Sequence, residues 1–88
     1  PMTYDQTLDR IQLLIATIAG PDRMPAQVTP DTPLGADGYC FDSLDVLEVI
    51  LGCEREFDLI FEDSGALNAD ALLSARRLAD LVHPMLVR

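Results

Sequence analysis

Residues 43–57 read SLDVLEVILGCEREF, and this stretch decides the fold. At about 100° per residue, its apolar side chains fall into two stripes on opposite faces of a helix. The wider stripe consists of Val46, Val49, Ile50, Cys53 and Phe57, and the narrower one of Leu44, Leu47 and Leu51. Since a stripe as wide as the first is typical of a helix packed on a core, we predict a helix from Ser43 to about Phe57.

The narrower stripe faces away from that core. A helix in a domain of 88 residues can bury one of the two stripes, so we expect the three leucines to be exposed. Glu48, Glu54 and Arg55 flank them, and an exposed apolar strip with a charged rim is typical of a docking surface. The alternative is a central helix that is buried on all sides.

A first helix is predicted over about residues 3–19, because its apolar residues are spaced three and four apart. Gly20 and Pro21 should end it. Residues 21–42 contain many prolines and glycines and predict a long loop, which Leu34 and Phe41 should pin to the core.

The remainder of the chain predicts two further helices. Residues 58–63 should form the connection that follows the helix over 43–57, with Leu59, Ile60 and Phe61 pointing inward. Good helix formers over 66–73 predict a short helix. Ser74 should cap a last helix over about 75–82, and Pro84 should end or kink it. The expected fold class is therefore all-α, a small four-helix bundle of three longer helices and one short helix.

Length and composition predict a single domain over residues 1–88. Pro1 precedes Met2, and we interpret it as an addition to the natural chain. No run of eighteen apolar residues is present, and nothing near the N-terminus has the pattern of a signal peptide. We therefore expect a cytoplasmic protein that does not enter a membrane, and we also expect a monomer.

The charge is strongly acidic, with a formal net charge of −9 at pH 7 and no lysine. Such a surface should repel nucleic acid and anionic membranes and attract basic protein surfaces. The alternative explanation is that the acidic residues only confer solubility.

The chain has two cysteines, Cys40 and Cys53, and a single histidine, and their spacing in the sequence is not that of a metal site. We therefore expect no metal site. Without a secretory signal, reduced thiols are the default, and no adjoining base activates either one.

Ser43 allows three interpretations. It is a helix cap, with Asp42 able to cap equally well; it is a nucleophile; or another enzyme modifies it. Nucleophilic catalysis needs a base, and the only histidine, His83, lies beside Pro84 in the last helix, where a surface position is expected. We therefore expect no catalytic residue. The start of a helix suits a phosphate ester, because its free N–H groups and dipole favour an anion.

The stretch Asp42-Ser43-Leu44-Asp45, with Val46-Leu47-Glu48-Val49 and Glu54-Arg55-Glu56-Phe57-Asp58 after it, resembles the acyl carrier proteins. The upstream Asp31-Thr32-Pro33-Leu34 and the final Leu78-Ala79-Asp80 extend the resemblance over nearly the whole chain. It implies a bundle of three longer helices and one short helix.

The resemblance also implies that Ser43 bears 4′-phosphopantetheine, installed from coenzyme A by a phosphopantetheinyl transferase. The terminal thiol of this arm would carry acyl groups as thioesters, and the chain itself would be no enzyme. Partners with basic surfaces would be an acyltransferase, a ketosynthase or an acyl or adenylating ligase. The implied docking residues are Asp42, Leu44, Asp45, Leu47, Glu48, Leu51, Glu54 and Arg55.

Three departures point to specialised biosynthesis, either polyketide or mixed peptide–polyketide. Residues 35–41 form a longer loop than in carriers of primary fatty-acid synthesis, the segment before Ser74 is also extended, and Arg55 stands where those carriers usually have an acid. Because Phe41 and Asp42, rather than a glycine-rich run, precede the serine, an acyl cargo is favoured over an aminoacyl one. The alternatives are a peptidyl or aminoacyl carrier, and a small acidic adaptor in which Ser43 is only a cap.

Overall fold

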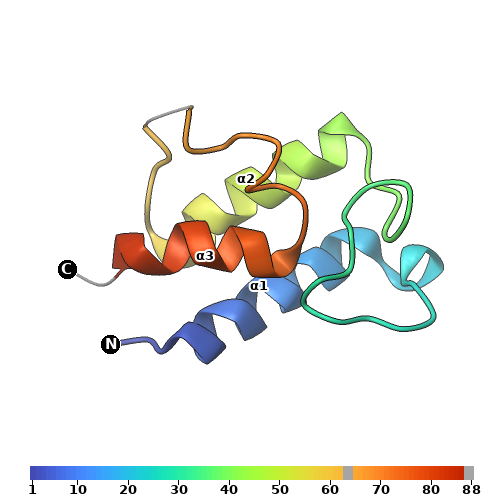
Figure 1. Cartoon of the computed structure of the whole chain (residues 1–88), viewed down its shortest axis with the longest axis horizontal. Helices are drawn as coiled ribbons and strands as arrows, with labels where there is room; N and C mark the ends of the chain where they lie inside the picture. The colour runs from blue at the N-terminus through green and yellow to red at the C-terminus, as the bar shows by residue number, and fades with distance from the viewer. Residues whose placement is uncertain (63–64, 87–88) are drawn as a thin grey trace.

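A computed structural model of the chain describes residues 1–62 and 65–86. Its elements are α1 (Tyr4–Ala19), the 3₁₀ turn η1 (Pro21–Arg23), α2 (Ser43–Phe57) and α3 (Ala75–Leu86) (Figure 1). Within the described residues, the only extended pairing is an isolated bridge between Pro33 and Ser74. The all-α class is thus confirmed.

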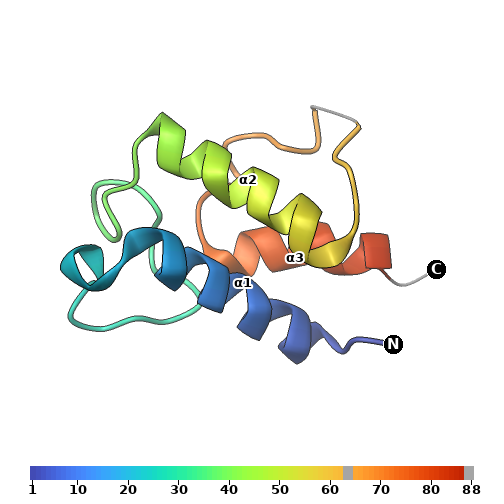
Figure 2. The ribbon, with the colours of Figure 1, turned by 180° about the vertical axis from the view of Figure 1, so that it is seen from behind.

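Helix α1 packs against both α2 and α3. Helix α2 runs back along α1 in the opposite direction, and α3 follows the same direction as α2 (Figures 1 and 2). The start of α1 and the end of α3 therefore lie at one end of the bundle, and the start of α2 lies at the other. No helix in the described ranges has both the length and the apolar character that crossing a bilayer requires.

The bounds of α1 and α2 agree with the sequence prediction. Thr3 caps α1 through a reciprocal pair of hydrogen bonds with Gln6. Gly20 ends α1 with φ of 69°, a conformation that glycine adopts without steric cost. Helix α2 spans Ser43–Phe57 as predicted.

The last helix begins as predicted but extends further. Ser74 caps it by accepting a 3.3 Å hydrogen bond from the Arg77 N–H. The expected end near Val82 is wrong, because the helix passes through Pro84 to Leu86. A proline inside a helix removes a backbone hydrogen bond. Leu86 packs against the core, and this burial offsets the loss.

The short helix expected over residues 66–73 does not form in the described residues, where turns and bends occur instead. The Asn68 side chain accepts a hydrogen bond from the Ala71 N–H at 3.0 Å, which competes with helical bonding. The Leu73 carbonyl accepts from the Leu34 N–H at 3.0 Å, so this end of the segment is held against the long loop.

The connection after α2 is anchored by two of the three residues expected to point inward. Leu59 and Phe61 are partly buried against the core. Ile60 is 69% exposed, so its predicted inward position is wrong. The Leu59 N–H bonds the Glu54 carbonyl and the Phe61 N–H bonds the Glu54 carboxylate, and fixing both neighbours turns Ile60 outward.

The core sits where the three helices meet, and the long loop closes one end of it. Leu34 and Phe41 pin the loop as predicted, and Tyr39 adds a third buried contact that the sequence analysis missed. The buried apolar side chains of the helices are Leu8, Ile11, Ile15, Ala19, Val49, Cys53, Phe57, Ala75, Leu78, Ala79 and Val82.

Residues 33–41 form a tight loop that leads into α2. The Pro33 carbonyl accepts a hydrogen bond from the Tyr39 N–H at 3.0 Å, and the Leu34 carbonyl accepts from the Phe41 N–H at 2.8 Å. Gly38 lies next to these hydrogen bonds, where its backbone closely approaches Pro33. A Cβ atom at Gly38 would lie 1.9 Å from the Pro33 oxygen, so the loop can close this way only with glycine.

Gly38→Ala is therefore expected to lower the free energy of unfolding by about 1–3 kcal/mol, because the added methyl group forces the backbone apart. Gly35→Ala is the matched control, since a Cβ there meets nothing within 4 Å, and its effect should stay within about 0.5 kcal/mol. Urea unfolding of both variants measures the difference. Equal effects would contradict the close approach at Gly38.

Candidate functional site

Ser43 is the first residue of α2, and its side chain is exposed. The helix is capped by its neighbour: the Asp42 carboxylate accepts a 2.9 Å hydrogen bond from the Asp45 N–H. The Asp45 carboxylate in turn accepts a 3.0 Å bond from the Asp42 N–H, which completes a capping box. Of the two caps that the sequence allowed, the structure uses Asp42, so the Ser43 hydroxyl is not needed for capping.

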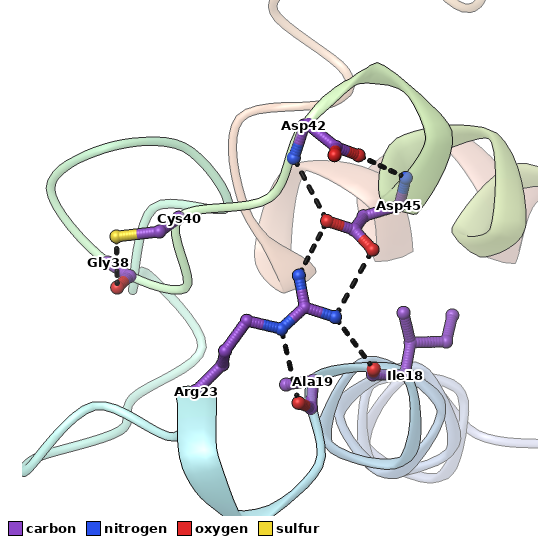
Figure 3. A network of polar contacts seen from close by, with 7 residues as sticks. All are labelled: Ile18, Ala19, Arg23, Gly38, Cys40, Asp42 and Asp45. Atoms are coloured by element: carbon purple, nitrogen blue, oxygen red, sulfur yellow. Dashed lines mark hydrogen bonds and ion pairs between the residues drawn. The ribbon is translucent and has the colours of Figure 1, made fainter.

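Arg23 joins the end of α1 to the start of α2 (Figure 3). Its Nη1 donates to Asp45 Oδ2 at 2.6 Å, and its Nη2 donates to Asp45 Oδ1 at 3.2 Å. The same guanidinium donates to the carbonyls of Ile18 at 3.1 Å and Ala19 at 3.3 Å. These are carbonyls of the last turn of α1, which carry the negative end of the helix dipole.

The Arg23 guanidinium also covers the Phe41 ring, with its Cζ atom 5.2 Å from the ring centroid. Cation–π contact adds to the ion pair and fixes the chain directly before Asp42. The role of Arg23 was not predicted from the sequence. The available signal was a basic residue just after a helix that ends in Gly20 and Pro21, where it can reach the last carbonyls of α1.

The electrostatics of this contact are mutual. The hydrogen bond from Arg23, together with that from the Asp42 N–H, holds the pKa of the Asp45 carboxyl below its ordinary value. The Asp45 carboxylate raises the pKa of Arg23. Both groups therefore remain charged at neutral pH, and the start of α2 stays fixed beside Ser43.

The narrow stripe of α2 is exposed as predicted: the exposed fractions are 69% for Leu44, 48% for Leu47 and 46% for Leu51. On the opposite stripe, Val49, Cys53 and Phe57 are buried in the core and Val46 packs against it. Ile50, predicted to belong to the same stripe, is only half-buried. The alternative of a helix buried on all sides is therefore wrong.

The charged residues expected beside this stripe differ in what they contact. Glu48 and Arg55 are exposed. Asp45 has both oxygens engaged by Arg23 and the Asp42 N–H, and the half-buried Glu54 accepts from the Phe61 N–H at 2.9 Å. Asp45 and Glu54 are therefore hydrogen-bonded within the fold, whereas the Glu48 carboxylate has no such bond within the part of the chain that the structure describes.

Ser43 and His83 are not brought together. His83 lies in the last turns of α3, at the end of the bundle away from the start of α2 (Figure 1). It is half-buried rather than on the surface, with Nδ1 3.0 Å from the Thr7 hydroxyl and its ring 5.7 Å from that of Tyr4. A serine–histidine pair is thus not assembled from these residues.

The two cysteines lie in different surroundings. Burial, with Glu54 and Glu56 nearby, raises the pKa of Cys53 to about 12, so this thiol stays protonated. Cys40 is exposed in the loop and its Sγ contacts the Gly38 carbonyl at 3.7 Å (Figure 3). Residues 1–62 and 65–86 hold no cluster of three or more histidine, cysteine or acidic side chains suited to a metal.

Comparison with known proteins finds a relative among the acyl carrier proteins. An acyl carrier protein of Cyanidioschyzon merolae is 37% identical to this chain over 65 residues, which cover 74% of this chain and 68% of the relative. No protein-family model matches the chain. No solved structure matches it significantly either.

The assignment of the cap predicts different effects for two adjacent residues. Asp42→Ala should lower the free energy of unfolding by about 0.5–2 kcal/mol, because an N–H of α2 loses its acceptor. Ser43→Ala should change it by less than about 0.5 kcal/mol, since the hydroxyl caps nothing. Thermal or urea unfolding measures both. A larger loss for Ser43→Ala would show that the serine is the cap.

The Arg23–Asp45 contact predicts a pH dependence. Because the pKa of Asp45 lies below its ordinary value of 3.8, ionised Asp45 stabilises the fold above that pH, and this contribution is lost as pH falls through the lowered pKa. Asp45→Asn should thus lower the urea midpoint at neutral pH, and the difference from wild type should narrow at an acidic pH below the lowered pKa of Asp45.

The control for that measurement is Asp9→Asn, which removes the same charge from an exposed carboxylate of α1. It should leave the urea midpoint nearly unchanged at both pH values. If Asp45→Asn behaves like Asp9→Asn at neutral pH, the contact with Arg23 does not stabilise the fold.

Proposed function

This chain belongs to the acyl carrier protein family, and we propose that it carries acyl groups as thioesters on a 4′-phosphopantetheine arm attached to Ser43. The observation that carries the proposal is the freedom of the Ser43 hydroxyl. Asp42 supplies the cap, so the exposed serine at the start of α2 is available to another enzyme.

The residues around Ser43 fit a phosphodiester. The start of a helix offers unbonded N–H groups and the positive end of the helix dipole, both of which favour an anion. Attachment forms a bond between the Ser43 Oγ and the phosphorus of coenzyme A that bears the pantetheine. The pyrophosphate P–O bond breaks, adenosine 3′,5′-bisphosphate leaves, and the serine hydroxyl loses its proton. When bound, the arm supplies a terminal thiol for thioester formation. The chain presents the cargo and leaves the chemistry to its partners.

Partners would dock on the exposed leucines of α2, Leu44, Leu47 and Leu51, which start directly after Ser43. Asp42 and Glu48 add exposed negative charge beside these leucines. This favours a phosphopantetheinyl transferase, an acyltransferase, a ketosynthase or a ligase with a basic surface, and such docking should weaken with salt.

For the pathway, we propose specialised biosynthesis of the polyketide or mixed peptide–polyketide type. Two features support it. The loop over residues 35–41 is long and has its own closed structure, fixed by Gly38 against Pro33. Arg55 places a positive charge on the docking side of an otherwise acidic helix.

The test is incubation of the chain with coenzyme A, Mg²⁺ and a phosphopantetheinyl transferase of broad specificity, followed by intact-protein mass spectrometry. A gain of about 340 Da is expected, the mass of one phosphopantetheine arm. Ser43→Ala should abolish the gain while leaving the fold intact. Leu47→Asp should slow it, because the transferase loses an apolar contact beside the serine.

The chain offers a matched control for the leucine variant. Leu13 is as exposed as Leu44 but lies on α1, so Leu13→Asp adds the same charge without changing the leucines of α2 and should leave the rate of mass gain unchanged. A gain that survives Ser43→Ala, or no gain with several transferases, contradicts the proposal. The second result would favour an acidic adaptor that binds through the leucines alone.

A further inference from the structure

A groove of about 410 Å³ lies between α1 and α2, beside the exposed leucines. Its lining consists of Leu14, Thr17 and Ile18 from α1 and Glu48, Leu51 and Arg55 from α2. The side chain of Leu14 lies against Gly52, where a Cβ would be 2.6 Å from Leu14 Cδ1. The two helices therefore approach closely below the groove.

The hydroxyl group that α1 contributes to the groove already has a hydrogen-bond partner. The Thr17 hydroxyl donates to the Leu13 carbonyl at 2.8 Å. Leu14, Ile18 and Leu51 supply apolar surface around it. The central part thus suits an apolar side chain, which needs no hydrogen-bond partner.

Arg55 is distinct among the arginines that the structure describes. The other four form ion pairs, which are Arg10 with Glu56, Arg23 with Asp45, Arg76 with Asp31 and Arg77 with Asp70. Within residues 1–62 and 65–86, Arg55 has no such pair and is exposed at the groove. In a chain of net charge −9, this places an uncompensated positive charge on the docking side of α2.

The charges in the groove are ordered along α2. Glu48, Leu51 and Arg55 follow a spacing of three and four residues, so they share one face of the helix. Glu48 and Arg55 are seven residues apart, which separates them by about 10 Å along the axis. The groove therefore presents an acid, an apolar centre and a base in that order.

We infer that this groove takes a helix of a partner protein that carries an acidic side chain for Arg55, a large apolar side chain for the centre and a basic side chain for Glu48. The inference rests on the proposed docking role of α2 and narrows it. A wholly basic partner surface matches Glu48 but is repelled by Arg55. Arg55 is thus a specificity-determining residue that selects partners of mixed charge.

The test uses the full unmodified chain and two helical peptides that differ at one position. One has Glu, Leu and Arg at positions 1, 5 and 8 of the matching face, and the other has Arg in place of the Glu. Dissociation constants come from NMR titration of the backbone amides. The mixed peptide should shift the amides of Leu14, Thr17 and Leu51 in a saturable way.

Arg55→Glu should change the ratio of the two dissociation constants by about threefold to tenfold in favour of the basic peptide, the size expected when an exposed ion pair becomes a repulsion. Arg77→Glu is the matched control, because it changes the net charge equally but lies on α3, where Arg77 pairs with Asp70. For Arg77→Glu, the ratio of the two dissociation constants should stay near that of wild type.

The inference is overturned if Arg55→Glu shifts the ratio no more than Arg77→Glu, or if the peptide-induced shifts lie outside the groove. This outcome is separable from failure of the carrier function. The peptide titration does not depend on Ser43, whereas the mass gain with coenzyme A does not depend on the ratio of peptide affinities.

Discussion

The contact between Arg23 and Asp45 is the interaction on which the site depends. One guanidinium binds two carbonyls at the end of α1, both oxygens of a carboxylate at the start of α2, and the ring of Phe41. It thereby brings together segments that are 22 residues apart in the sequence. Asp45 also completes the capping box of α2, so the same carboxylate fixes both where the helix starts and where it lies.

This arrangement separates structural from functional tasks at the start of α2. Asp42 and Asp45 hold the helix, and Ser43, which lies between them, stays exposed and unused by the fold. Further along, Glu54 holds the connection after α2, while Glu48 and Arg55 remain exposed beside the leucines. A serine that the fold does not need, next to an apolar surface that the core does not cover, is what a carrier requires.

Patterns of a few neighbouring residues predicted much of the fold. The wrong or missing predictions share a cause, which is contact with residues distant in the sequence. The bounds of α2 follow from its apolar spacing and from Asp42, both of which act within a few residues. The predicted helix over residues 66–73 does not form. The Asn68 side chain accepts a hydrogen bond from the nearby backbone, and the Leu73 carbonyl accepts one from the N–H of the distant Leu34. Pro84 stays helical because Leu86 packs on the core. Arg23 was missed because its partner, Asp45, comes within reach only after the loop closes.

The central claim is that Ser43 carries the arm in the living cell. Mass spectrometry of the intact chain from its native host, with fragmentation to locate the added mass, tests it most directly. The expected result is an added phosphopantetheine on Ser43, with or without an acyl group. A chain recovered from producing cells with unmodified Ser43, or with the arm on another residue, would contradict the account.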